Sequence, residues 1–191
     1  MKNFFFNLIT VFFLMTFPPI GILCMFKLTN WPRMRVLFLD FDGVLNSDRY
    51  VKERDWRTQG NIDETRLPLL RRIIDETGAV IVLSTSWREH WDPDPARCAP
   101  GWRPTGELLA RYGIEILDRT PKYGGYDRDL EVRAWLTAHE DEVESFVILD
   151  DLRFGWGDLE ERLVRTDMKI GRGLMDDHVE RAIALLLTPL R

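Results

Sequence analysis

Short apolar runs alternate with longer amphipathic segments through most of this chain. Apolar runs of about four to five residues, bounded by turn signals, predict strands that are buried on both faces of a sheet. The predicted strands are Val36–Leu39, Ala79–Leu83, Ile114–Leu117 and Phe146–Leu149, with Leu163–Thr166 as a candidate fifth. The predicted helices are Arg66–Thr77, Gly106–Tyr112, Arg128–Ala138 and Asp177–Leu187. Thr65 and Thr105 are the expected caps of the first two helices.

Strands that alternate with helices predict a three-layer α/β fold with a parallel, Rossmann-like sheet. Right-handed crossovers bring the carboxyl ends of all the strands to one edge. Open α/β sheets bind their ligands at that edge. Residues that directly follow the strands are therefore expected to lie close together, although they are far apart in the sequence.

Two aspartates follow the first predicted strand. Asp40 comes directly after Leu39, Asp42 follows two residues later, and Gly43 allows a sharp turn. Two carboxylates this close repel each other when both are ionised, unless a cation or a raised pKa relieves the repulsion. A hard cation such as Mg²⁺ takes oxygen ligands and accepts phosphate as a further one. The simpler interpretation is a turn that carries two solvated aspartates.

Polar side chains also follow the other predicted strands. Ser84 and Thr85 come after the second strand, where their hydroxyls could bind a phosphate, although such residues more often form a turn or a cap. Asp150 and Asp151 come after the fourth strand. The topology should bring these groups to Asp40 and Asp42, and a carboxylate cluster of this kind implies a metal ion.

The first 33 residues differ from the rest of the chain. The stretch from Asn3 to Phe26 carries no charged residue and is long enough to cross a bilayer. Three interpretations remain open: a membrane anchor, a cleaved signal peptide, or a mis-called start ahead of a natural start at Met34. We therefore expect a cytoplasmic domain over residues 34–191, or a membrane-anchored one if the segment is a real anchor.

Charge and cysteine content argue against some classes of function. The net charge is −5, and because the first 33 residues hold three basic residues and no acid, the remainder carries −8. This balance argues mildly against a general nucleic-acid binder, which needs local positive charge. The two cysteines give no disulfide framework and no metal-ligand spacing.

Residues 87–104 interleave tryptophans with basic residues and prolines. One interpretation is a substrate wall, in which the rings stack on bases and the cations meet phosphates. The favoured alternative is a loop held in place by its own tryptophans and prolines.

At these positions the sequence resembles the haloacid dehalogenase (HAD) superfamily. Four of its motifs appear in order: Leu39-Asp40-Phe41-Asp42-Gly43-Val44, then Leu83-Ser84-Thr85, a basic residue at Lys122, and Leu149-Asp150-Asp151. The run from Leu83 to Arg88, and Gly173-Leu174 before the last helix, look like a small, nearly capless HAD subgroup. That subgroup occurs alone and in RNA-repair-associated proteins. The resemblance covers roughly residues 34–187.

The resemblance implies a Mg²⁺-dependent phosphatase. Asp40 would be the nucleophile that forms an aspartyl-phosphate, and Asp42 would protonate the leaving oxygen and then activate water. Lys122 would neutralise the transferring group, although Arg128 lies near enough in sequence to replace it, and Lys122 could be a solvated surface lysine. The implied metal ligands are Asp40, Asp42 through its carbonyl, Asp150 and Asp151. The implied substrate-binding residues are Ser84, Thr85, Arg88 and Lys122.

The intervals after the first and second motifs leave room only for loops, at Asn46–Thr65 and Trp87–Pro104. A minimal cap or no cap is therefore expected. An open site suits a large substrate such as a nucleotide, a nucleic-acid end or a phosphoprotein, and it also admits small phosphates. The alternatives are a small-metabolite phosphatase and a non-catalytic module that binds phosphate or Mg²⁺.

Overall fold

A computed structural model describes residues 33–53, 62–124, 127–153, 155–168 and 172–190. The expectations for the apolar segment lie outside these residues, except for Arg33. Residues 33–191 form one compact unit. None of the helices in the described ranges has the length and the apolar character needed to cross a membrane.

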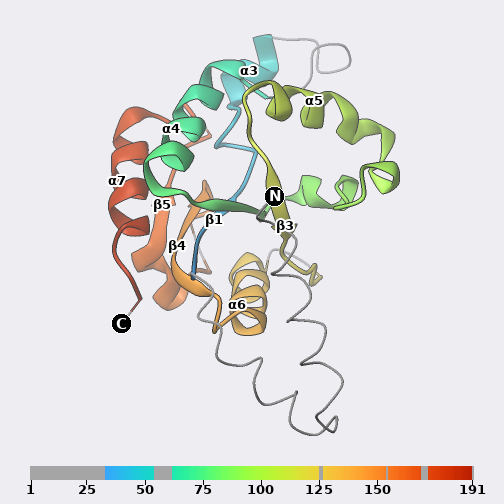
Figure 1. Cartoon of the computed structure of the whole chain (residues 1–191). Helices are drawn as coiled ribbons and strands as arrows, with labels where there is room; N and C mark the ends of the chain where they lie inside the picture. Colours follow the sequence, from blue (N-terminus) through green and yellow to red (C-terminus); the bar gives the residue numbers. More distant parts are fainter. Residues whose placement is uncertain (1–32, 54–61, 125–126, 154, 169–171, 191) are drawn as a thin grey trace, which may run out of the picture. The chain divides into compact units, whose positions relative to one another are not determined.

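Five parallel strands form a single sheet in the order β3-β2-β1-β4-β5 (Figure 1). The strands are β1 (Met34–Leu39), β2 (Val80–Leu83), β3 (Ile116–Arg119), β4 (Val143–Asp150) and β5 (Leu163–Arg165). The sheet confirms the predicted parallel α/β fold. The third strand begins two residues later than predicted, so Asp118 lies within β3.

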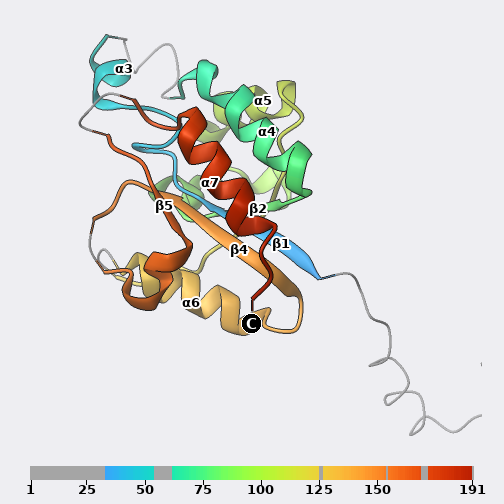
Figure 2. The ribbon, with the colours of Figure 1, turned by 90° about the vertical axis from the view of Figure 1, so that its left-hand side faces the viewer.

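The helices lie on both faces of this sheet. They are α3 (Asp48–Glu53), α4 (Leu67–Thr77), α5 (Arg103–Arg111), α6 (Arg128–Ala138) and α7 (Asp176–Leu186). Helix α3 was not predicted, because it buries none of its side chains and so has no apolar stripe. Figure 2 shows α6 on the opposite side of the strands from α4 and α7.

Both predicted caps were wrong. Asp63, not Thr65, accepts the first free backbone N–H, because a short 3₁₀ turn over Glu64–Arg66 precedes α4. Thr105 lies inside α5, which begins two residues earlier at Arg103. The predicted end of this helix at Thr77 is confirmed: the next residue, Gly78, has φ +67°, a left-handed conformation that favours glycine.

The alternation of side chains along β1 builds a core on each face of the sheet. Leu37 and Leu39 pack with the buried faces of α4, α5 and α7. Val36 and Phe38 pack with α6 and with the 3₁₀ segment Gly157–Arg162 on the other face. Because β1 is covered on both faces, its sequence is a continuous apolar run rather than an alternating one.

The register of the central strands brings their carboxyl ends to one level. Leu39 of β1 is paired with Leu83 on one side and Leu149 on the other. Each of these leucines is followed by a polar residue, and the backbone N–H groups of Asp40 and Ser84 continue the ladder to Leu149 O and Leu39 O at 3.0 and 2.9 Å. The first polar residue after each central strand is thereby fixed at the same edge.

A separate cap domain is not formed among the described residues. The described part of the interval between β1 and β2 holds the six-residue α3 and α4. The interval between β2 and β3 holds short 3₁₀ turns and α5. This agrees with the expectation of a minimal cap.

Candidate active site

Three carboxylates meet at the carboxyl edge of the sheet. One oxygen from each of Asp40, Asp150 and Asp151 lies within 4.8 Å of the others. Asp40 and Asp150 are buried and Asp151 is partly exposed. Burial raises the pKa of Asp40 to about 6, and burial together with the neighbouring Asp40 raises the pKa of Asp150 well above its ordinary value. Such a cluster is costly unless positive charge is close.

Arg128 supplies positive charge from the first residue of α6. Its Nη1 lies 3.5 Å from Asp40 Oδ1 and 3.7 Å from Asp150 Oδ2. The side chain of Arg128 is only 14% exposed, so little water screens these pairs. Its charge opposes the effect of burial and lowers the pKa of both acids.

Asp42 lies apart from the three-carboxylate cluster. Asn46 Nδ2 donates a hydrogen bond of 2.8 Å to Asp42 Oδ1, and Trp87 Nε1 donates one of 2.9 Å to Asp42 Oδ2. Asn46 also accepts the Gly43 N–H at 2.9 Å, which ties the turn together. The sequence did not identify Asn46 as part of the site, because its contact with Asp42 depends on the conformation of the turn after β1.

Gly43 is required by the approach of Asp151. It has φ +77°, and a Cβ at this position would lie 2.6 Å from Asp151 Oδ2. Any larger side chain would push into that carboxylate. The turn after β1 and the acidic pair after β4 therefore fit directly against each other.

Ser84 and Thr85 follow β2 and are fully buried. Ser84 Oγ makes no hydrogen bond within the described structure. Thr85 hydrogen-bonds the Asp40 side chain, which lowers the pKa of that carboxyl, and it accepts the Trp87 N–H at 3.3 Å. An unpartnered buried hydroxyl costs free energy, and a phosphate oxygen near Ser84 would satisfy it.

Arg88 is buried, and its side chain also reaches the wall of the pocket described below. It is 5% exposed and forms an ion pair of 2.6 Å with Glu131 of α6, which is equally buried. Arg88 Nη1 also donates to Thr85 O at 2.7 Å, and Glu131 accepts the Tyr123 N–H at 3.0 Å. The pair joins the segment after β2 to α6 and to the loop after β3.

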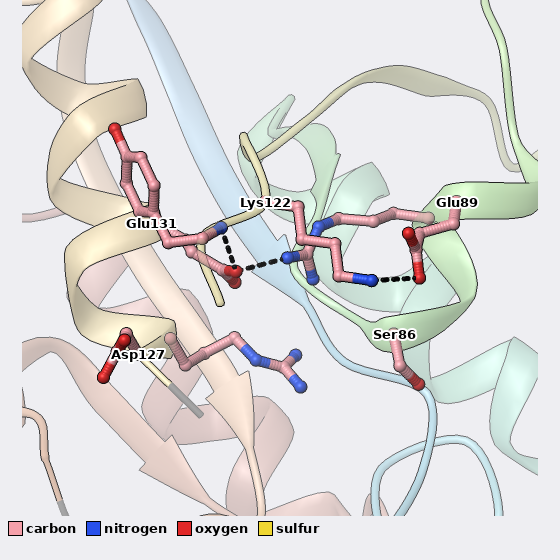
Figure 3. Close-up of a pocket in the computed structure, with 8 residues that line it drawn as sticks. Ser86, Glu89, Lys122, Asp127 and Glu131 are labelled. Carbon is pink, nitrogen blue, oxygen red and sulfur yellow. Dashed lines mark hydrogen bonds and ion pairs between the residues drawn. The ribbon is translucent and has the colours of Figure 1, made fainter. Parts of the chain in front are cut away.

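A pocket of about 200 Å³ opens between the segment after β2 and the start of α6 (Figure 3). Its lining residues are Ser86, Arg88, Glu89, Lys122, Tyr123, Asp127, Arg128 and Glu131. Lys122 stands in its wall, with the ammonium group directed to Glu89 Oε2 at 2.6 Å. Both side chains are more than half exposed. The structure thus brings Arg128 to the carboxylates and leaves Lys122 paired at the surface.

The tryptophans of the 87–104 loop pack into the protein. Trp91 and Trp102 are 8% and 7% exposed and belong to the core beneath the loop. Trp102 stacks on Phe41, and Trp87 meets the same ring edge-on. Burial prevents Trp91 and Trp102 from stacking on bases, so the packing interpretation accounts for these two rings.

The carboxylate cluster has the chemistry of a site for a hard cation. Asp150 Oδ2 is fully buried and makes no hydrogen bond within the described structure. Three carboxylates with oxygens this close offer the donor set that Mg²⁺ prefers. The residues present therefore fit the metal that the sequence implied.

A five-stranded parallel sheet in this order, with acids after β1 and β4, defines a Rossmann-like α/β protein with a HAD-type core. The comparison with known families agrees: residues 36–179 match the family described as the HAD domain in Swiss Army Knife RNA repair proteins. The chain therefore belongs to this family. No curated protein and no solved structure shows a significant match to it.

Proposed function

We propose that this domain is a Mg²⁺-dependent phosphohydrolase that works through an aspartyl-phosphate and acts on phosphorylated nucleotide or nucleic-acid ends. The observation that carries the proposal is the cluster of Asp40, Asp150 and Asp151 with the Arg128 guanidinium beside it. The family also supports it, because its members are HAD domains of RNA repair proteins.

Asp40, Asp150 and Asp151 would hold the metal, with the Asp42 carbonyl as a further ligand. When bound, Mg²⁺ would neutralise charge on the carboxylates and on the phosphoryl oxygens. Burial raises the pKa of Asp40 and of Asp150, and added positive charge beside these acids would favour their ionised forms.

In the first half-reaction, an Asp40 carboxylate oxygen attacks phosphorus while the bond from phosphorus to the leaving oxygen breaks. Asp42 gives its proton to the leaving oxygen. Ser84 Oγ and Arg128 hold the phosphoryl oxygens; Ser84 Oγ is buried and makes no hydrogen bond within the described structure.

In the second half-reaction, Asp42 takes a proton from water, and the water oxygen attacks phosphorus. The bond between phosphorus and Asp40 breaks and inorganic phosphate leaves. Asp40 returns as a carboxylate and Asp42 as an acid, so the cycle closes without another reactant.

Arg128 is the better candidate for the basic residue of the third HAD motif (the third-motif cation), because its guanidinium forms ion pairs with Asp40 and Asp150. Lys122 and Thr85 then do not contact the transferring phosphoryl group. Lys122 lies in the pocket wall, where it can meet the part of the substrate outside the scissile phosphate. Thr85 orients Asp40 through its hydrogen bond.

The test is a phosphatase screen of the full-length protein with Mg²⁺. The substrates are 3′- and 5′-phosphorylated oligonucleotides, a mononucleotide and a hexose phosphate. Asp40→Asn is the control, because it keeps the shape of the side chain and removes the nucleophilic carboxylate. We expect Mg²⁺-dependent release of phosphate that Asp40→Asn abolishes, with the oligonucleotides giving the highest kcat/KM.

Two results would redirect the proposal. A preference for the hexose phosphate would indicate a small-metabolite phosphatase. Binding of Mg²⁺ without turnover on any substrate would indicate a non-catalytic module.

A further inference from the structure

Both carboxylate oxygens of Asp42 are engaged by side chains from two different parts of the chain. Asn46, in the same turn, donates to Oδ1 at 2.8 Å. Trp87, which comes after β2, donates to Oδ2 at 2.9 Å. The first contact is local, whereas the second links the turn after β1 to the segment that carries Ser84 and Thr85.

The Trp87 indole is itself held in place. Its ring meets Phe41 edge-on, with centroids 5.5 Å apart and an interplanar angle of 74°. Its backbone N–H is bonded to Thr85 Oγ1 at 3.3 Å. Phe41 lies directly between Asp40 and Asp42 in the sequence, so the ring that supports Trp87 is part of the same turn as the two acids.

We infer that Trp87 is a positioning residue for Asp42, and that its Nε1–H fixes the direction of the carboxyl group that serves the leaving oxygen. The inference rests on the proposed function, in which Asp42 is the general acid. An aspartate in a turn can rotate about its side-chain bonds, and two donors on opposite oxygens select one orientation. Trp87 thereby aligns Asp42 with the phosphate-binding segment after β2.

Trp87→Phe is the variant that tests this inference. It keeps an aromatic ring against Phe41 and removes the N–H donor together with the five-membered ring of the indole. Trp102→Phe is the matched control, because Trp102 stacks on the same Phe41 ring, with centroids 6.0 Å apart. Within the described chain, the hydrogen bonds to the Asp42 carboxylate come from Asn46 and Trp87, not from Trp102.

The first measurement compares two substrates in the full-length protein. An alkyl phosphate, such as a nucleoside monophosphate, needs its leaving oxygen protonated, whereas p-nitrophenyl phosphate needs this far less. We expect Trp87→Phe to lower kcat for the alkyl phosphate by about 10- to 100-fold, the usual effect of a small misplacement. The loss on p-nitrophenyl phosphate should stay below about threefold, and KM should change little. Trp102→Phe should change both substrates by the same factor.

The second measurement does not depend on activity. The indole N–H resonance of Trp87 is assigned in a ¹⁵N–¹H spectrum by its absence in Trp87→Phe. Asp42→Asn should shift this resonance upfield because a neutral amide is a weaker acceptor. The indole resonance of Trp102 should move much less.

The two measurements separate the possible failures. An equal loss on both substrates in Trp87→Phe, or an unchanged Trp87 resonance in Asp42→Asn, would overturn the positioning role. A shifted resonance in a protein without phosphatase activity would leave the contact established and refute the proposed function, and with it the catalytic meaning of the contact.

Discussion

Arg128 Nη1 lies 3.5 Å from Asp40 Oδ1, and this contact joins the start of α6 to the end of β1. The two residues belong to elements that are distant in sequence and adjacent in the fold. The contact puts a permanently charged guanidinium beside the proposed nucleophile, where it offsets the burial of the acid. The choice between Arg128 and Lys122 as the third-motif cation can therefore be tested directly.

Arg128→Gln should lower kcat by about 10³-fold, because an arginine that neutralises a transferring phosphoryl group contributes on this scale. Lys122→Gln should lower it by less than about tenfold, because Lys122 is paired with Glu89 in the pocket wall. Steady-state kinetics of the two variants decide between them. The opposite ranking would return the third-motif role to Lys122.

Asp42→Asn should slow turnover of an alkyl phosphate by about 10²- to 10⁴-fold, the usual contribution of general acid–base catalysis. The loss should shrink with p-nitrophenyl phosphate, whose leaving group needs little protonation. The comparison uses kcat for the two substrates at saturation. Equal losses on both would argue that Asp42 has another role.

Asp150→Asn should stabilise the metal-free protein. The variant removes a fully buried carboxylate that lies close to Asp40 and Asp151. In EDTA, Tm should rise by about 2–4 °C, which corresponds to about 1 kcal/mol for a domain of this size. Mg²⁺ should raise the Tm of the wild type and not that of the variant. Asp141→Asn, at an exposed position, is the control and should alter neither value.

Glu131→Gln should destabilise the fold by about 3 kcal/mol, because it leaves the buried Arg88 without its counter-charge. Denaturant unfolding measures the loss. Glu53→Gln breaks the exposed pair with Arg49 and serves as the control, with no measurable change expected. If Glu131→Gln unfolds like the wild type but binds substrate poorly, Arg88 would be a substrate contact rather than a structural one.

A chain of residues 34–191 should fold by itself. Its first strand begins at Met34, and residues 33–191 form one compact unit. Size-exclusion chromatography and thermal unfolding of this fragment should show a single species that unfolds cooperatively. Aggregation of the fragment under conditions in which the full chain folds would place the preceding segment in the core.

The central strands and the acids that follow them could be predicted from the apolar runs alone. Val36–Leu39 and Phe146–Leu149 are continuous apolar runs because β1 and β4 are covered on both faces. Because the two strands run parallel in one sheet, their carboxyl ends lie at the same edge. The meeting of Asp40 with Asp150 and Asp151 follows from these two facts and could be foreseen without coordinates.

Helix boundaries were harder to predict from the sequence, because the position of a cap depends on which of several possible local turns forms. Thr65 and Thr105 each have the hydroxyl of a good cap, yet a 3₁₀ turn before α4 and an earlier start of α5 displaced both. A residue type that is favourable at a cap position does not by itself determine the residue at which the helix begins.

Which side chains reach the acids depends on how the elements pack against one another, and the sequence pattern did not predict it. Arg128 and Lys122 are both basic and lie close in sequence, but only Arg128 is on the first turn of α6, where packing on the sheet directs it to Asp40. Likewise, a tryptophan in a loop can face a substrate or the core, and Trp87 became the partner of Asp42 while Trp91 was buried. Sequence spacing records which residues lie near one another along a strand or helix. The direction of a side chain between elements is set by the packing of those elements, which no local pattern records.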